Sequence, residues 1–344
     1  MARPYGQDMQ TRLDIRTLDP YDDAQMHRFH EIFWRAEKED GRHWNVFWTY
    51  GELATVLREP TADRRMTGCC VFEGDQMVAA GILELSLLDN REKAFLFPAV
   101  EPARRGRGLG GALLEELVEV ARGDGRTRLL TDAVLPYAER ETSGVLRFVD
   151  AHGFRLSNIE IYRVLPLPVP AGLLDGLAAD AEGHHEGYAL ESYVDDLPER
   201  YLLSYCHLRN QLAVDAPTGE VDFEAAGVTP EIQRGKLERN RRIGRTTLFT
   251  VAVRDGEVVA HSDLIVAPSA TEAQQMGTLV RRDHRGHRLG TAVKVANLRR
   301  LQEARPEVVE VHTQNAETNR WMVDINVRLG FEPVGVCPEF VRDV

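Results

Sequence analysis

Residues 104–111 read RRGRGLGG, and residues 284–291 repeat the pattern as HRGHRLGT. Each copy follows a short apolar stretch and precedes a run with helical spacing, at residues 112–122 and 292–302. A glycine-rich turn between a strand and a helix presents backbone N–H groups at the positive end of the helix dipole. The sequence therefore predicts two places that can bind a phosphorylated ligand.

The repeat extends beyond these turns. A strand, a tight Gly/Asp turn and a second strand surround Gly74 in the first half and Gly256 in the second. Gly-Phe pairs at residues 153–154 and 330–331 follow the two helical runs. Because three anchors recur at nearly the same long spacing, the pattern indicates two duplicated domains rather than a solenoid.

Composition agrees with a globular protein of two domains. The chain has 344 residues, of which 43% are hydrophobic and 28% charged, and its net charge is −12. This acidity argues against nucleic acid as a partner, and no apolar run approaches the length of a membrane span. The four cysteines show no CxxC spacing, so we expect reduced thiols and no metal site. Reduced thiols are typical of the cytoplasm, and we therefore expect a cytoplasmic protein. We also expect no membrane partner.

The pattern of each half predicts an α/β fold. In the first half we expect strands at 13–16, 68–72, 77–88, 92–100, 128–133 and 156–165, and helices at 21–39, 50–58, 112–122 and 143–151. In the second half we expect strands at 189–192, 247–253, 257–266, 272–280 and 310–313, and helices at 198–213, 230–242, 292–304 and 317–328.

The domain boundaries follow from a break between the two series. Residues 166–170 read PLPVP, which interrupts regular structure, and the polar segment after it has room for one short helix. We therefore expect a first domain over 1–165, a linker over 166–186 and a second domain over 187–344. The polar residues 1–12 are expected to be frayed.

This order of elements resembles the GNAT superfamily of acyl-coenzyme A-dependent N-acetyltransferases. The coenzyme-binding pattern of that family is Arg/Gln-x-x-Gly-x-Gly/Ala, and residues 105–110 match it fully. In the second copy, Arg288 stands where the middle glycine is usual. The later run TQNAETN at residues 313–319 and the Gly-Phe at 330–331 resemble bacterial tandem GNAT proteins, the kind that includes mycothiol synthase.

The resemblance implies two GNAT-like domains, each a mostly antiparallel, splayed central sheet flanked by helices. It also implies acetyl-coenzyme A as the co-substrate, with its pyrophosphate on the glycine turns and its pantetheine arm between splayed strands. The residues that it assigns to coenzyme binding are Val100, Arg105, Gly106, Arg107, Gly108, Leu109, Gly110, Gly111, Leu279, Val280, Arg285, Gly286, His287, Arg288, Leu289, Gly290, Thr291, Asn315 and Asn319.

Acetyl transfer needs a neutral amine, a polarised thioester carbonyl and a proton for the leaving thiolate. Many GNAT enzymes use a tyrosine four residues before the Gly of Gly-Phe as the acid, where this chain has Val149 and Asn326. In the second half, His261, Asp263 and Glu272 lie on central strands as candidate bases, although each could instead point elsewhere. The predicted catalytic residues are therefore His261, Asp263, Glu272 and Asn326.

The resemblance leaves three function classes open. We expect an acetyl-coenzyme A-dependent N-acetyltransferase that acts on a small-molecule amine by direct attack on the thioester. The second half is favoured for catalysis because of its polar series after residue 312. A peptide or protein acetyltransferase and a non-catalytic acyl-coenzyme A-binding protein are the alternatives. We expect a monomer or a homodimer.

Overall fold

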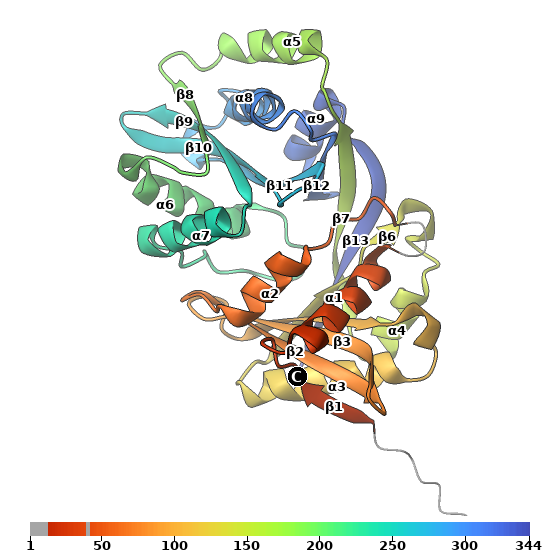
Figure 1. The fold of residues 1–344 in the computed structure, drawn as a ribbon. Helices are drawn as coiled ribbons and strands as arrows, with labels where there is room; N and C mark the ends of the chain where they lie inside the picture. The colour runs from red at the N-terminus through yellow and green to blue at the C-terminus, as the bar shows by residue number, and fades with distance from the viewer. Residues whose placement is uncertain (1–12, 39–41) are drawn as a thin grey trace, which may run out of the picture.

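A computed structural model of the chain describes residues 13–38 and 42–344. Its strands form one long sheet in the order β1-β2-β3-β4-β5-β13-β7-β12-β11-β10-β9-β8, with β6 paired to β13 at the side (Figure 1). The parallel pairs among the described strands are β4 with β5 and β11 with β12, and the other pairs are antiparallel. The predicted mixed α/β fold with mostly antiparallel strands is confirmed.

The first half contains the elements that its sequence pattern predicts, together with the short strand β6, which was not predicted. Its strands are β1 (Asp14–Thr17), β2 (Arg64–Glu73), β3 (Gln76–Ser86), β4 (Lys93–Val100), β5 (Arg128–Asp132), β6 (Leu135–Pro136) and β7 (Arg155–Pro166). Its helices are α1 (Asp23–Lys38), α2 (Tyr50–Arg58), α3 (Leu109–Gly123) and α4 (Gly144–Ala151). The expectation for residues 1–12 lies outside the described residues.

The second half repeats this order. Its strands are β8 (Ala189–Val194), β9 (Thr246–Arg254), β10 (Glu257–Val266), β11 (Glu272–Val280), β12 (Glu310–Ala316) and β13 (Glu332–Asp343). Its helices are α6 (Glu199–Asp215), α7 (Pro230–Arg242), α8 (Leu289–Ala304) and α9 (Arg320–Leu329). Strand β13 was not predicted from the sequence pattern. It pairs with β5 and β7 of the first half and so joins the two halves.

The two halves exchange their last strands. β7 belongs to the first half by sequence, but it pairs with β12 of the second half from Pro166 opposite Glu310 to Glu160 opposite Ala316. β13 pairs with β5 of the first half, where Glu339 lies opposite Asp132. β7 and β13 also pair with each other in the middle of the molecule (Figure 1). Each half therefore completes its sheet with a strand from the other half.

Helices cover both faces of the sheet in each half. In the first half α3 packs on one face and α1 with α2 on the other, and each layer has its own buried apolar cluster. In the second half α8 and α5 share a cluster on one face, while α6 and α7 share one on the other. Among the described helices none is both long and apolar enough to cross a membrane.

The range predicted as a linker holds helix α5 (Ala171–Glu182), which lies against α8 (Figure 1). Gln302 on α8 accepts a hydrogen bond from the Val169 backbone at 2.6 Å, and Arg299 on α8 pairs with Asp175 at 2.5 Å. The boundaries at 165/166 and 186/187 stay a prediction. The segment between them is packed on the second half rather than extended.

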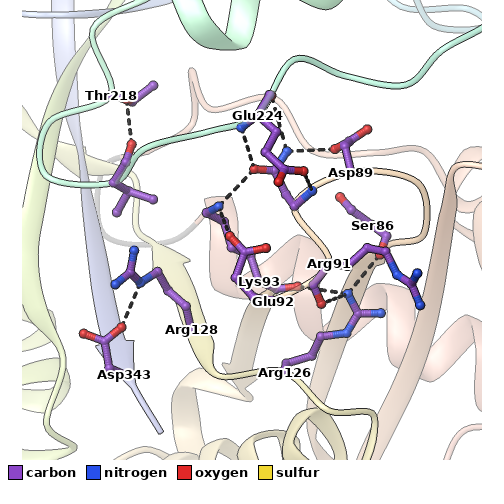
Figure 2. A network of polar contacts seen from close by, with 12 residues as sticks. Ser86, Asp89, Arg91, Glu92, Lys93, Arg126, Arg128, Thr218, Glu224 and Asp343 are labelled. Carbon is purple, nitrogen blue, oxygen red and sulfur yellow. Dashed lines mark hydrogen bonds and ion pairs between the residues drawn. The ribbon is translucent and has the colours of Figure 1, made fainter.

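The connection between α6 and α7 lies on the first half. Figure 2 shows Glu224 from this connection beside Asp89 of the first half. The Asn90 backbone N–H donates to Glu224 Oε2 at 2.9 Å. The Asn90 side chain accepts from the Glu224 backbone at 3.0 Å and from Lys93 Nζ at 3.0 Å. These paired contacts fix the second half against the β3–β4 turn of the first.

Candidate active site

Each glycine turn leads into a helix whose first N–H groups have no partner within the helix. α3 begins at Leu109 after the left-handed Gly108, and α8 begins at Leu289 after Arg288. Neither helix has a side-chain cap. The turns thus keep the free backbone donors that an anionic ligand requires.

Arg288 does not disrupt the second turn. It adopts φ 52° and ψ 18°, the left-handed region that Gly108 occupies with φ 80° and ψ −4°. Its guanidinium forms an ion pair with Asp180 on α5 and donates to the Asp180 carbonyl at 2.9 Å. The side chain is therefore held by the linker helix, and the backbone keeps the shape of the glycine turn.

The other cations of the second turn are also bound by protein groups. Arg285 and Arg282 both pair with Asp215 at 2.5 Å, and the Asp215 side chain is only 2% exposed. The two arginines lower the pKa of this carboxyl, against the effect of burial. His287 Nδ1 lies 3.0 Å from the His184 carbonyl. The first turn differs at the corresponding position, because its Arg107 side chain is exposed to solvent.

Not every predicted coenzyme residue presents its side chain at a turn. Leu109 and Leu289 are 2% and 1% exposed, so each can offer only its backbone there. Leu279 packs in the apolar cluster beneath α6. Asn319 is the N-cap of α9, where its side chain accepts from the Met322 backbone at 3.3 Å.

Strands β11 and β12 separate in the second half. They pair from Glu272 opposite Glu310 to Gln274 opposite His312 and then diverge. A cavity of about 400 Å³, here cavity A, occupies the opening. Side chains from β11, β12, α8 and the start of α9 line it, among them Gln274, Thr278, Lys294, Asn315, Asn319 and Met322.

A β-bulge lies at the wall of cavity A. Gly277 pairs with Asp263 and Gln275 with Leu264, which leaves Met276 as the extra residue on β11. Gln275 Nε2 donates to the Asp263 carbonyl at 2.6 Å and to the Gly277 carbonyl at 3.0 Å. The Gln275 side chain therefore satisfies backbone acceptors where the ladder is interrupted.

The corresponding strand of the first half has a different backbone. β4 pairs with β3 in unbroken register from Ala94 to Val100. It carries Pro98, which has no N–H, at the position where β11 has Thr278. β4 and β5 also diverge, after Phe95 and Leu130. Both halves thus have a gap between two diverging parallel strands, but of the two strands β4 and β11 the bulge is found in β11.

Lys294 is the residue that sequence analysis missed. It lies one turn into α8, is 1% exposed, and its Nζ donates to Asn326 Oδ1 at 2.8 Å. Asn326 Nδ2 in turn donates to Asn315 Oδ1 at 2.5 Å. The available signal was a lysine between Val293 and Val295 in an otherwise buried stretch of helix.

Two of the predicted bases lie away from the cavities. His261 and Asp263 are 0% and 4% exposed, and their Nδ1 and Oδ1 atoms are 3.1 Å apart. Tyr205 on α6 donates to Asp263 Oδ2 at 2.7 Å. This trio lies beneath Gly277, where an added Cβ would be 3.5 Å from His261 Cε1. Among the described residues, neither His261 nor Asp263 lines cavity A or cavity B, which is described next.

A second cavity of about 210 Å³, here cavity B, adjoins cavity A. Both are lined by Val46, Gln274 and Met276. The first half contributes Phe47 and Trp48 to cavity B, and the second half contributes predicted base Glu272. The predicted catalytic residues are therefore spread over three places: the buried trio, cavity B and the Lys294 network.

Three arginines also line cavity B, Arg64 from the first half and Arg239 and Arg245 from the second. Arg245 pairs with Glu52 at 2.5 Å, with side chains that are 18% and 4% exposed. Arg239 donates weakly to the Glu59 carbonyl at 3.4 Å, and burial together with the nearby Arg245 charge lowers its pKa. Cavity B thus combines aromatic walls with arginines and with the carboxylates of Glu52, Glu59 and Glu272.

Carboxylates gather where β5, β13 and β7 meet beside the first half. Asp132 lies opposite Glu339, and Glu160 follows on β7. Burial and the charges of Glu339 and Asp132 raise the pKa of Glu160 to about 7. Across residues 13–38 and 42–344 no three His, Cys, Asp or Glu side chains are arranged to hold a metal ion.

Comparisons with known proteins identify the family. The model of the acetyltransferase (GNAT) family matches residues 13–140, which contain the intact glycine pattern. A tandem GNAT protein from the clavulanic acid biosynthesis pathway superposes with a TM-score of 0.78 and 27% identity, over 96% of this chain and 98% of that one. The chain is a tandem GNAT acetyltransferase.

Other solved structures share the fold of this tandem GNAT protein at lower identity. A GCN5-related N-acetyltransferase from Sphaerobacter thermophilus is 17% identical, with a TM-score of 0.64 over 97% of this chain and 96% of that one. A glucosamine N-acetyltransferase region of a fungal β-N-acetylglucosaminidase is 13% identical, with a TM-score of 0.66 over 96% of this chain and 38% of that one. No curated protein matches the sequence. The GNAT family uses an acyl-coenzyme A as co-substrate.

Proposed function

We propose that the protein transfers an acetyl group from acetyl-coenzyme A to the amine of a small molecule, and that the second half carries out the transfer. The observation that carries this proposal is cavity A, which lies between the diverging strands β11 and β12 beside the bulge at Met276. The first half has neither a bulge between Lys93 and Val100 nor an N–H at Pro98.

The residues of the second half suit the chemical needs of the reaction. The N–H groups of the turn at 285–290 would hold the coenzyme pyrophosphate. Backbone N–H groups beside the bulge would polarise the thioester carbonyl, because an interrupted ladder leaves donors unpaired. The acceptor nitrogen then attacks the carbonyl carbon, the carbon–nitrogen bond forms, and the carbon–sulfur bond breaks.

Cavity B is the proposed place for the acceptor. It adjoins cavity A at Met276, and its volume of about 210 Å³ suits a small molecule better than a peptide. Phe47 and Trp48 would contact an apolar body, and Arg239, which forms no ion pair among the described residues, would favour an anionic substituent. Glu272 lines the same cavity and remains the candidate base there.

The first half supports a second role in coenzyme binding. Its intact turn lies within residues 13–140, which match the family model. Val149, where many GNAT enzymes have their acidic tyrosine, is 5% exposed and packs in the core. We therefore propose that this half can bind the coenzyme without transferring the acyl group. A monomer or homodimer remains our expectation.

A coenzyme-release assay tests the proposed function. Purified protein with acetyl-coenzyme A should release free thiol with some members of a panel of small amines, including amines that carry a carboxylate. The acetylated product is identified by mass spectrometry. Release with peptides but with no small amine would favour a peptide acetyltransferase. Tight binding of coenzyme with no release in either panel would leave a binding protein and contradict the proposal.

A further inference from the structure

Lys294 is a buried lysine at the wall of cavity A, and no carboxylate of the described residues pairs with it. Its Nζ donates to the Asn326 amide at 2.8 Å and lies 5.2 Å from the centre of the Phe331 ring. Among the described residues no carboxylate forms an ion pair with Lys294, whereas Lys93 and Lys236 pair with Glu92 and Asp63. A protonated amine in this position has an unusually poor environment.

Two groups that contact Lys294, the Asn326 amide and the Phe331 ring, are both neutral. Asn315 of β12 contacts Asn326 in turn, and Thr278 of β11 lines cavity A together with Lys294. Three further titratable groups, Glu160, Tyr162 and His312, also line this cavity. Burial alone lowers the pKa of Lys294 to about 7. The amine can therefore change its protonation state near neutral pH.

The fold does not require a lysine at this position. The two turns align Leu109 of α3 with Leu289 of α8, so Lys294 corresponds to Leu114 in the first half. Leu114 is 1% exposed and packs in an apolar core. Since an apolar residue satisfies the same helix position in the duplicated half, the amine of Lys294 has a purpose other than packing.

We propose that Lys294 is the acid that protonates the coenzyme thiolate as it leaves. The inference rests on the proposed function of the second half. Lys294 contacts Asn326, which occupies the place of the family's usual tyrosine acid but cannot itself supply a proton. When the carbon–sulfur bond breaks, the sulfur takes a proton from the Lys294 ammonium. The attacking nitrogen loses a proton to a base or to water, and Lys294 is reprotonated from solvent.

The first experiment reads the protonation of Lys294 without turnover. The chain has four lysines, Lys38, Lys93, Lys236 and Lys294, so protein with ¹³Cε-labelled lysine gives a simple NMR spectrum. The Lys294→Met variant assigns the signal. We expect it to titrate near pH 7, and we expect coenzyme A to shift the titration while desulfo-coenzyme A, which lacks the thiol, does not. Equal shifts with both ligands, or titration near 10, would overturn the proposal.

The second experiment uses the pH dependence of turnover. In the wild type, kcat should fall above pH 7 as Lys294 loses its proton. Lys294→Met retains an unbranched chain of similar length, and it should lower kcat about a hundredfold and remove the fall above pH 7. An unchanged pH profile in this variant would exclude Lys294 as the acid.

A separate control distinguishes this proposal from that of the catalytic half. Gly286→Glu places a carboxylate in the turn before α8, where no atom lies within 4 Å of an added Cβ, whereas Lys294 contacts Asn326 and Phe331. If Gly286→Glu keeps the wild-type kcat/KM for acetyl-coenzyme A, the second half is not catalytic and the proposed function fails. If Gly286→Glu lowers kcat/KM for acetyl-coenzyme A at least roughly tenfold while Lys294→Met keeps the wild-type kcat and pH profile, the proposed function stands and the role of Lys294 fails.

Discussion

Arg288 in the second half holds the same left-handed backbone conformation as Gly108 in the first, with φ 52° against 80°. A residue with a Cβ is strained in this region, by about 1 kcal/mol or more. The linker helix compensates by offering Asp180 to the Arg288 guanidinium. The substitution that departs from the family pattern is therefore tied to the element that joins the two halves.

This relationship predicts the order of two variants. Arg288→Gly removes the strain and the ion pair, while Arg288→Ala removes only the ion pair. Both variants lose the exposed ion pair, which contributes about 0–1 kcal/mol, so their difference in stability reports the backbone strain. Arg288→Gly should therefore be more stable than Arg288→Ala by about 1 kcal/mol. Urea unfolding of both variants measures the difference. Equal stability would mean that the left-handed conformation costs nothing at this position.

The buried pair between Glu52 and Arg245 should stabilise the contact between the halves. Arg245→Met leaves the Glu52 carboxylate buried without its partner, so the free energy of unfolding should fall by about 3 kcal/mol. The exposed pair of Arg234 with Glu199 is the control, because Arg234→Met should lower the free energy of unfolding by less than about 1 kcal/mol. Similar losses in both variants would show that Glu52 reaches water.

Stability should change with pH because of Glu160. Its pKa rises from 4.5 in the unfolded chain to about 7 in the fold. Between these values the unfolded state releases the proton first, so Glu160 destabilises the fold increasingly as pH rises to 7 and fully above it. Glu160→Gln should therefore raise the urea midpoint at pH 8 and have less effect at pH 4. A benefit that is the same at both pH values would contradict this account.

Strand exchange should keep the halves together after the chain is cut. A protease site engineered into the exposed segment between Gly183 and Gly187 would separate α5 from β8. We expect both fragments to elute together in size-exclusion chromatography, because β7 and β13 each pair with the other half. Fragments that separate without denaturant would show that the exchanged strands contribute little.

The repeated local pattern predicted most of the fold. The turns, the hairpins around Gly74 and Gly256 and the helices after the turns all lie where their spacing indicated. The exchange of β7 and β13 was not predicted, because strand periodicity gives the inward face of a strand but not its partner. A sequence in which each half repeats the other is equally compatible with closed domains and with exchanged ones.

The candidate site was predicted less completely. Asn315 and Asn319 line cavity A and Glu272 lines cavity B, while their roles stay predictions. His261 and Asp263 lie beneath the sheet instead, because alternation along β10 turns them toward Tyr205 on α6. Lys294 was overlooked because a lysine on a helix is normally solvated, and only the packing of α8 shows that this one is buried.

One measurement tests most directly the claim that acetyl transfer takes place in the second half. Gly106 and Gly286 are matched positions, with φ 77° and 88° and no atom within 4 Å of an added Cβ, so replacement by Glu strains both turns equally. The kcat/KM for acetyl-coenzyme A should fall at least roughly tenfold in Gly286→Glu, since the new carboxylate repels the pyrophosphate. Gly106→Glu should keep most of the wild-type value. Loss of activity in Gly106→Glu together with full activity in Gly286→Glu would place the reaction in the first half and contradict the account.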